Sequence, residues 1–330
     1  MDTSKTFLES CDHHRIPIYQ WPLENPRGAI LVLHGMAEHG LRYARLAQAL
    51  NAAGYTVMAI NHRGHGEDTP EVGLGTFAPE NGWNKVLDDV DRAWSYMRKS
   101  VRKHTHQNSP DTPLFVLGHS MGSFITQAWL MKQPENVAGA VLSGSNFTPA
   151  TLLKLGRLVT LMESYRIGTS SCSKLVDTLT FGSYNNAFKP VRTSFDWLSR
   201  DAAEVDTYIA DPLCGFQCTN GLWLDLFQGL LSISSVSALK NIDSQLPLYI
   251  VGGDKDPVGQ AGKGLRKLAG ALVAAGLQDI TTDIYPNGRH EMFNETNRDE
   301  VTTRLTAWLD NISLNIPDHR MHARRPKATL

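Results

Sequence analysis

Short apolar segments alternate with longer segments of helical periodicity along most of this chain. The apolar segments lie at residues 29–33, 56–60, 114–117, 137–142 and 248–251. Between the first two of them, residues 43–50 repeat apolar side chains at helical spacing, and Gly54 is suited to end such a helix. This alternation predicts an α/β fold in which a mostly parallel sheet carries helices on both faces.

The alternation stops between residues 148 and 239. That segment is rich in Leu, Phe, Trp and Ser and shows helical spacing without strand-turn-helix units. After Pro247 the alternation resumes, with a helix expected at about 262–275 and a strand at about 281–285. We therefore expect the sheet-containing core to be interrupted by an inserted helical segment.

These patterns divide the chain into three parts. We predict a discontinuous core of residues 1–147 and 240–316, and a helical cap, or lid, of residues 148–239. Residues 317–330 are basic and have no apolar periodicity, so we expect a flexible tail without a binding role.

Composition excludes several classes of function. The formal net charge of the 330 residues is -1, so the surface offers no strong field to attract nucleic acid. The first residues lack the apolar run of a secretory signal, and no segment is long and apolar enough to span a bilayer. Four cysteines are too few for a disulfide framework in a chain of this length. We expect a cytoplasmic protein with reduced cysteines.

The segment Gly118-His-Ser-Met-Gly122 carries the strongest chemical signal. It follows a predicted strand and precedes a segment of helical spacing, which is the setting of a G-x-S-x-G nucleophile turn. Glycine is needed on both sides because side chains there would collide with neighbouring chain. The turn lifts the Ser120 hydroxyl out of the sheet, beside the N–H groups that begin the helix.

A serine nucleophile needs a base and an acid from the same edge of the sheet. His290 follows the last predicted strand on a loop that contains glycine, so it is the predicted base. Two aspartates follow the strand 248–251, and we predict Asp256 as the acid because it stands far enough into the turn to bend back over the edge. Asp254 remains the alternative, and would otherwise cap the turn.

An ester or amide carbonyl under attack also needs donors for the oxyanion. The backbone N–H of Met121, directly after Ser120, is the first predicted donor. The His34-Gly-Met36 turn at the end of an early strand offers the N–H of Met36 as the second. Both donors belong to the backbone, so the side chains at these positions do not define the function.

Other motifs fail, and we expect neither a metal nor a cofactor. The segment beginning His290-Glu291 lacks the second histidine of a zinc protease helix. Gly73 and Gly75 do not lead from a strand into a helix, as a dinucleotide fold requires. Cys214 and Cys218 have no second pair of ligands at zinc-finger spacing, so we expect thiols that pack in the protein.

Together these residues make the chain similar to the monoacylglycerol lipase and lysophospholipase branch of the α/β hydrolases, also grouped as serine aminopeptidase-like (S33) hydrolases. The matching segments are 34–39, 61–66, 118–122, 253–258 and 289–291. The resemblance implies the α/β-hydrolase fold, with an eight-stranded sheet flanked by helices and an inserted helical cap. It also implies ester hydrolysis without a cofactor, with Ser120, Asp256 and His290 as the triad and Met36 and Met121 as oxyanion donors. Ala37 stands where the family has glycine, which leaves the backbone donor intact.

The cap favours a lipid-like ester, such as a monoacylglycerol or a lysophospholipid, as the substrate. Four apolar residues at helical spacing are typical of an amphipathic helix packed on the core, and the same residues are candidates to line an acyl chain: Trp223, Leu226, Phe227 and Leu230. Such a substrate would bring the protein into transient contact with a membrane surface.

Two other functions are kept open. An aminopeptidase would use the same triad and would need acidic cap residues for the substrate ammonium, with Glu204, Asp206 and Asp211 as candidates. A ligand-binding protein without turnover would use the fold alone. The sequence does not indicate an oligomeric state.

Overall fold

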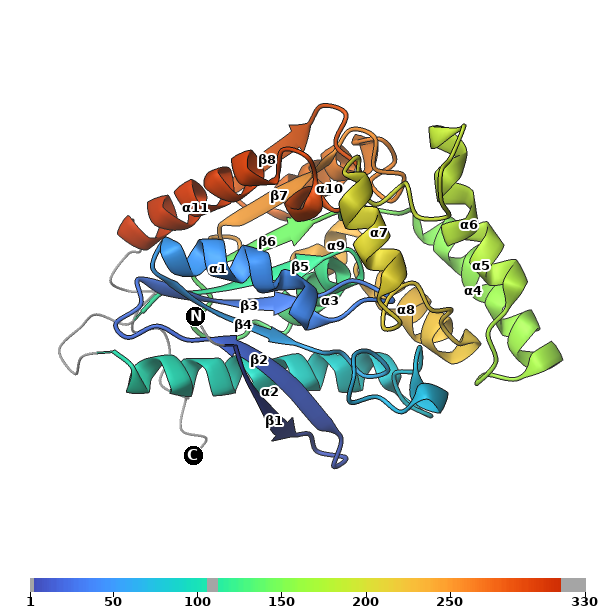
Figure 1. The fold of residues 1–330 in the computed structure, drawn as a ribbon, viewed down its shortest axis with the longest axis horizontal. Coiled ribbons are helices and arrows are strands. Elements are labelled where there is room, and N and C mark those ends of the chain that lie inside the picture. The colour runs from blue at the N-terminus through green and yellow to red at the C-terminus, as the bar shows by residue number, and fades with distance from the viewer. Residues whose placement is uncertain (1–2, 106–111, 316–330) are drawn as a thin grey trace.

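A single twisted sheet of eight strands runs through the computed structural model, which describes residues 3–105 and 112–315 (Figure 1). The strand order is β1-β2-β4-β3-β5-β6-β7-β8. Strand β2 pairs antiparallel with β1 and β4, and the remaining pairs are parallel. The strands are β1 Ser4–Glu9, β2 Arg15–Trp21, β3 Gly28–Leu33, β4 Tyr55–Ile60, β5 Leu114–His119, β6 Gly139–Ser143, β7 Leu248–Gly253 and β8 Ile280–Tyr285. The predicted mostly parallel eight-stranded sheet is confirmed.

Helices cover both faces of the sheet. Helices α1 and α11 pack on one face, and α2, α3 and α10 on the other (Figure 1). The α-helices are α1 Ala44–Ala52, α2 Gly82–Lys103, α3 Met121–Leu130, α4 Ala150–Ile167, α5 Lys174–Leu179, α6 Phe181–Tyr184, α7 Ala202–Ala210, α8 Asn220–Ser232, α9 Val236–Leu239, α10 Lys263–Ala275 and α11 Arg298–Leu314. Short 3-10 turns include η1 Gly40–Tyr43 and η4 Met292–Asn294.

Alternate residues of each central strand enter two separate cores. In β3, Ile30 and Val32 join the core under α1 and α11, whereas Leu31 and Leu33 join the core under α2, α3 and α10. Because both faces are covered, the central strands are apolar at nearly every position. This is why they stand out in the sequence as continuous apolar segments.

The two N-terminal strands did not stand out in this way. Strand β1 lies at the edge of the sheet and is only partly buried, and β2 contains Pro17, which cannot donate to a strand ladder. The segments predicted from the alternation correspond to β3 through β8, with ends that differ by one or two residues.

The inserted segment is helical, as its spacing predicted. Residues 148–239 are all described and contain α4 through α9 without a strand. Helix α8 packs against α4 on one side and against α2 and α3 on the other. Residues 317–330, the predicted tail, lie outside the described residues. Among the helices of residues 3–105 and 112–315, none combines the length and apolarity needed to cross a membrane.

The contact of α8 with α2 predicts a stability difference between two helical glycines. A Cβ at Gly229 would lie 2.2 Å from the buried ring of Trp83, whereas a Cβ at Gly270 in α10 would meet nothing within 4 Å. We expect Gly229→Ala to lower the free energy of unfolding by about 1–3 kcal/mol. As the matched control, Gly270→Ala should raise it by about 0.5–1 kcal/mol. Urea unfolding measures both, and equal effects would contradict the close packing of α8 on α2.

Candidate active site

Ser120 lies in the sharp turn that joins β5 to α3. Its backbone has φ 51° and ψ −119°, a region that residues with a Cβ rarely adopt. Hydrogen bonds hold the turn: the Ser120 N–H donates to Ser143 O over 2.8 Å, and the Ser123 N–H and hydroxyl donate to Ser120 O over 2.9 and 2.6 Å. A strained residue that is fixed in this way is typical of a functional position.

Crowding around the turn explains both flanking glycines. A Cβ at Gly118 would lie 2.3 Å from the carbonyl oxygen of Gly122. A Cβ at Gly122 would lie 2.0 Å from the carbonyl oxygen of Leu33, at the end of β3. Neither contact is open to a real side chain, so the predicted reason for glycine at these positions is confirmed.

His290 and Asp256 form a buried hydrogen-bonded pair. The distance from His290 Nδ1 to Asp256 Oδ2 is 3.0 Å, and both side chains are at most 2% exposed. The second oxygen of Asp256 accepts the Val258 N–H over 2.8 Å. Since the carboxylate fixes the hydrogen on Nδ1, Nε2 of the imidazole is left as an acceptor.

The two aspartates after β7 have different surroundings. Asp254 Oδ1 accepts the Asn287 N–H over 2.7 Å, so this side chain joins the loops that follow β7 and β8. Asp254 therefore stabilises the turn, which is the role expected for it when Asp256 is the acid. The contact with His290 belongs to Asp256.

Ser120 and His290 both lie against the end of β6. The Ser120 N–H bonds to Ser143, and a Cβ on the next residue, Gly144, would lie 3.0 Å from His290 Nδ1. The ring of His119, the neighbour of Ser120, has its centroid 4.7 Å from that of His290. The structure thus brings the three predicted triad residues to the carboxyl edge of neighbouring strands β5, β6, β7 and β8.

The two histidines in contact differ in their proton affinity. Burial of the His290 ring lowers its pKa, but the carboxylates of Asp256, Glu291 and Glu38 together raise it, so that the pKa lies above the ordinary histidine value. Burial and the neighbouring His290 lower the pKa of His119 to about 4. Near neutral pH His119 is therefore uncharged, and His290 is the ring that can take up a proton.

The predicted oxyanion loop lies directly beside Ser120. A Cβ at Gly35 would be 3.2 Å from the Ser120 Cβ, which places the Gly35-Met36-Ala37 turn against the serine. Ala37 has φ 54°, the left-handed conformation that explains the family's glycine at this position. Its carbonyl accepts hydrogen bonds from the Tyr208 hydroxyl and from the Gly215 N–H, both over 2.9 Å. The inserted segment therefore holds this loop in its strained form.

The predicted acyl-lining residues lie on α8. Trp223, Leu226 and Phe227 are less than one-tenth exposed, and Leu230 is half-buried against the same core. The Phe227 ring packs on α4, where a Cβ at Gly156 would lie 2.7 Å from it. These side chains pack the inserted helices on the core, which is compatible with the predicted acyl-chain lining.

An aromatic group of Trp197, Tyr184 and Phe181 covers His290 and was not predicted from the sequence. The Trp197 ring lies 5.0 Å from the His290 ring, and Tyr184 and Phe181 pack on Trp197 with centroid distances of 4.9 and 5.9 Å. The backbone N–H of His290 also donates a hydrogen bond to Trp197 O over 3.4 Å. Trp197 lies between two short helices without a periodic pattern, so nothing local marked it.

One group of side chains has the composition of a metal site. Ligand atoms of His39, Asp211 and Cys214 lie within 4.8 Å of one another. His39 Nε2 and Asp211 Oδ2 bond to each other over 2.9 Å, and burial raises the pKa of the Cys214 thiol. His39 and Asp211 therefore pair with each other, the thiol is neutral, and His39 Nδ1 is buried without a hydrogen-bond partner among the described residues. The pair ties the oxyanion loop to the inserted segment.

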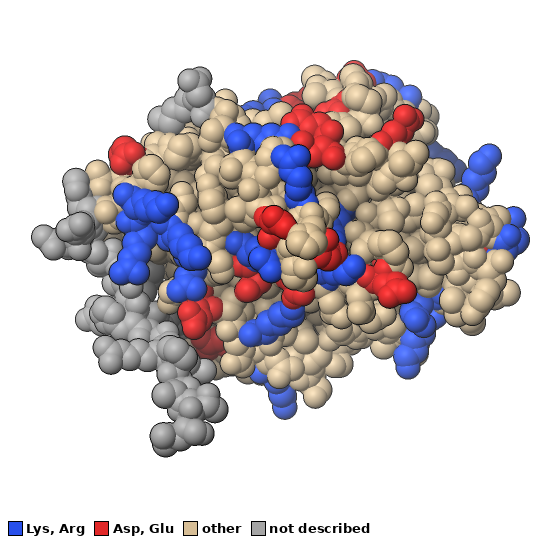
Figure 2. Space-filling model, turned by 90° about the horizontal axis from the view of Figure 1, so that it is seen from below, with Lys and Arg blue, Asp and Glu red and all other residues tan. Residues whose placement is uncertain are grey.

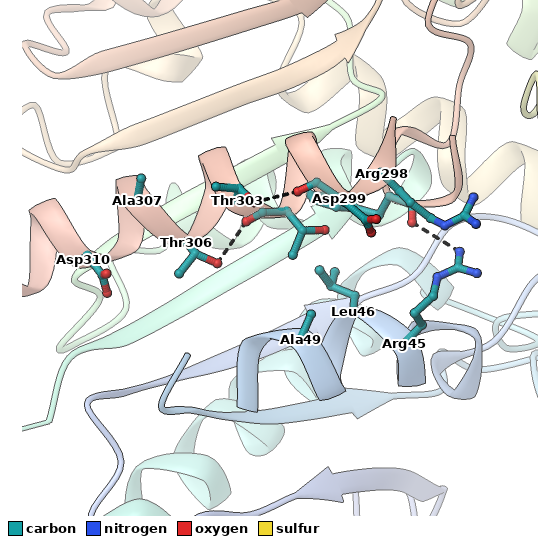
Figure 3. Close-up of a pocket in the computed structure, with 11 residues that line it drawn as sticks. Arg45, Leu46, Ala49, Arg298, Asp299, Thr303, Thr306, Ala307 and Asp310 are labelled. Carbon is teal, nitrogen blue, oxygen red and sulfur yellow. Dashed lines mark hydrogen bonds between the residues drawn. The ribbon is translucent and has the colours of Figure 1, made fainter. Parts of the chain in front are cut away.

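A separate hollow lies between α1 and α11 (Figure 3). Ion pairs with residues outside the hollow neutralise two of its cations, since Arg45 pairs with Glu204 and Arg298 with Asp201. Of the described residues that line it, none belongs to the predicted site.

Comparison with known proteins identifies relatives over almost the whole chain. A monoacylglycerol lipase of Mycolicibacterium smegmatis is 30% identical over 87% of this chain and 90% of the relative. A human monoglyceride lipase is 28% identical over 84% of this chain and 80% of the relative. A thermostable carboxyl esterase from Bacillus coagulans, crystallised with glycerol, superposes with a TM-score of 0.83 and 25% identity, covering 95% of this chain and 99% of the esterase.

These likenesses confirm the predicted α/β-hydrolase fold. The family described as serine aminopeptidase, S33 matches residues 24–297, a span that includes Ser120, Asp256 and His290. The resemblance inferred from the motifs is confirmed as well: this chain belongs to the serine aminopeptidase S33 family of hydrolases.

Proposed function

We propose that this protein is a serine hydrolase that cleaves carboxylic esters of lipid-like molecules, with Ser120 as nucleophile, His290 as base and Asp256 as the orienting acid. The buried hydrogen bond between His290 and Asp256, at the sheet edge where Ser120 occupies its strained turn, carries the proposal. Esterase and lipase relatives that cover nearly the full chain support the reaction class.

The reaction proceeds in two steps. His290 Nε2 accepts the proton of the Ser120 hydroxyl while the oxygen attacks the ester carbonyl, and the resulting imidazolium is stabilised by Asp256. The protonated imidazole then gives its proton to the departing alcohol, which leaves an acyl-enzyme. Water activated by the same imidazole releases the carboxylic acid and restores the serine.

The oxyanion of each tetrahedral intermediate would be bound by two backbone donors. We assign these to the N–H groups of Met121, at the first turn of α3, and Met36, in the loop beside Ser120. The hydrogen bonds from Tyr208 and Gly215 to Ala37 O support this assignment, because they hold the loop in place before the substrate binds.

The proposed substrate is a monoacylglycerol, with a lysophospholipid as the second choice. The relatives named monoacylglycerol and monoglyceride lipases support this class. We also propose that residues 148–239 act as a cap over the site and that Trp223, Leu226, Phe227 and Leu230 contribute to the acyl-chain side of it. These side chains of α8 are buried against α4 and the core, so the interior of the cap is apolar.

An aminopeptidase would need acidic side chains free to bind a substrate ammonium. The three candidates are each paired with a cation or a histidine of this chain: Glu204 with Arg45, Asp206 with Arg192, and Asp211 with His39. Because their charges are engaged, esters are the favoured substrates over peptides.

The proposal predicts how ester turnover depends on Ser120. With p-nitrophenyl esters from acetate to palmitate, we expect turnover by the native protein and a loss of about 10,000-fold or more in Ser120→Ala. Ser313→Ala on α11, a serine that donates to Leu309 O, is the matched control and should keep full activity. The chain length at which kcat/KM peaks distinguishes a lipase from a small-ester hydrolase. Activity retained in Ser120→Ala would contradict the mechanism, and turnover of aminoacyl anilides alone would indicate the peptidase.

A second part of the proposal concerns the surface of the cap. Helix α4 carries apolar side chains at helical spacing, each more than half exposed: Leu152, Leu155, Leu158, Met162 and Tyr165. The exposed charged side chains on this helix are basic, because Glu163 is buried. In Figure 2 the end of the molecule that carries α4 is mostly tan, with blue side chains at its edge. We propose that this apolar stripe makes transient contact with the lipid surface that holds the substrate.

The stripe predicts that two charges on α4 will weaken vesicle binding. Leu155→Glu combined with Met162→Glu should lower binding to phosphatidylcholine and phosphatidylserine vesicles by about 10-fold or more, since two apolar contacts with lipid are lost. Flotation of the vesicles measures the bound fraction. Val273→Glu, at an exposed apolar position of α10, is the control and should bind like the native protein. Unchanged binding by the α4 variant would rule out this surface.

A further inference from the structure

Arg42 lies at the end of the oxyanion loop, in the short turn η1 that leads into α1. Its guanidinium contacts two carboxylates at once. It bonds Glu38, and it forms two parallel hydrogen bonds of 2.8 Å with the two oxygens of Glu291. The three side chains are at most 11% exposed, so the cluster is nearly cut off from solvent.

Each carboxylate belongs to one of the two loops that build the proposed site. Glu38 accepts the N–H of Gly35 and the Tyr43 hydroxyl, and so fixes the start of the turn that presents the Met36 N–H. Glu291 directly follows His290 in the chain. Arg42 is thus a single cation that ties the oxyanion loop to the loop that carries the base.

The charges of this cluster also act on His290. The charged or titratable groups that act most strongly on the His290 ring include Asp256, Glu291, Glu38 and His119. The two glutamates favour the protonated ring, and Arg42 is the cation that neutralises them. Without Arg42, two buried negative charges would remain uncompensated beside the imidazole.

We propose that Arg42 is a positioning residue for the proposed hydrolase reaction: it aligns the oxyanion loop with His290 and offsets the buried negative charges of Glu38 and Glu291 beside the imidazole. The inference rests on the proposed function. The sequence motifs that contain Glu38 and Glu291 did not predict this role for Arg42, because Arg42 and Glu291 are 249 residues apart in the chain. A merely structural role would change stability without changing the protonation of His290.

Two substitutions of Arg42 distinguish positioning from a merely structural role by their kinetics. Arg42→Gln should lower kcat for a water-soluble ester by about 10- to 100-fold, a loss smaller than or similar to that of one oxyanion donor, with little change in KM. The acid limb of its pH-rate profile should move to higher pH, because a protonated His290 cannot act as base and the uncompensated glutamates favour that form. Arg42→Lys restores the charge but not the paired hydrogen bonds, so its acid limb should stay in place while kcat remains reduced.

Glu291→Gln is a second variant that tests the proposal even if Arg42→Gln does not fold. It keeps the bond between Arg42 and Glu38 and removes a negative charge beside His290, so kcat should fall while the acid limb moves to lower pH. Arg45→Gln, which breaks a half-exposed ion pair next to the same turn, is the matched control and should leave kcat and the profile unchanged. An unmoved acid limb in both Arg42→Gln and Glu291→Gln would overturn the proposal.

Direct titration of His290 distinguishes failure of this inference from failure of the proposed function. In protein with 13C-labelled histidine, the His290 ring signal, assigned by its loss in His290→Asn, is followed against pH by NMR. The midpoint should lie above that of an ordinary histidine in the native protein and rise further in Arg42→Gln. A rise without any Ser120-dependent turnover would count against the hydrolase alone. An unchanged midpoint would overturn the role of Arg42 whatever the turnover.

Discussion

The close contact between the β5–α3 turn and the end of β3 is the constraint on which the rest of the site depends. At Gly122 the backbone approaches the Leu33 carbonyl so closely that no side chain fits. Because β3 and β5 are neighbours in the sheet, the same contact places the loop after β3 beside Ser120. The proposed nucleophile and both proposed oxyanion donors are therefore fixed by one piece of backbone packing, before any side chain is considered.

The proposed acid and base come from the loops after β7 and β8, on the other side of β5 from β3. Strands β7 and β8 are neighbours, so the loops after them bring Asp256 and His290 into contact although they are 34 residues apart. Burial makes this contact strong, because a carboxylate removed from water has few other partners for its charge. The aromatic group around Trp197 and the ionic cluster around Arg42 then enclose the pair from the inserted segment and from η1.

The sequence predicted the parts of the site whose signals are local. Gly118, Ser120 and Gly122 lie in one turn, and Asp256 and His290 each lie in the loop after a strand that the apolar alternation predicted. The contacts that could not be predicted join distant segments. Trp197 contacts His290 from a segment without strands, and Arg42 contacts Glu291 although the two are 249 residues apart in the chain. Strands β1 and β2 were not predicted for another reason: the exposed edge at β1 and the proline within β2 weaken the apolar pattern.

The acyl-enzyme is the most direct test of this account. Native protein mixed with p-nitrophenyl decanoate and quenched in acid during turnover would be digested and analysed by mass spectrometry. We expect one decanoyl group per chain, on the peptide that contains Ser120. Ester turnover with no acylated Ser120, or with the acyl group on another residue such as Cys214, would contradict it.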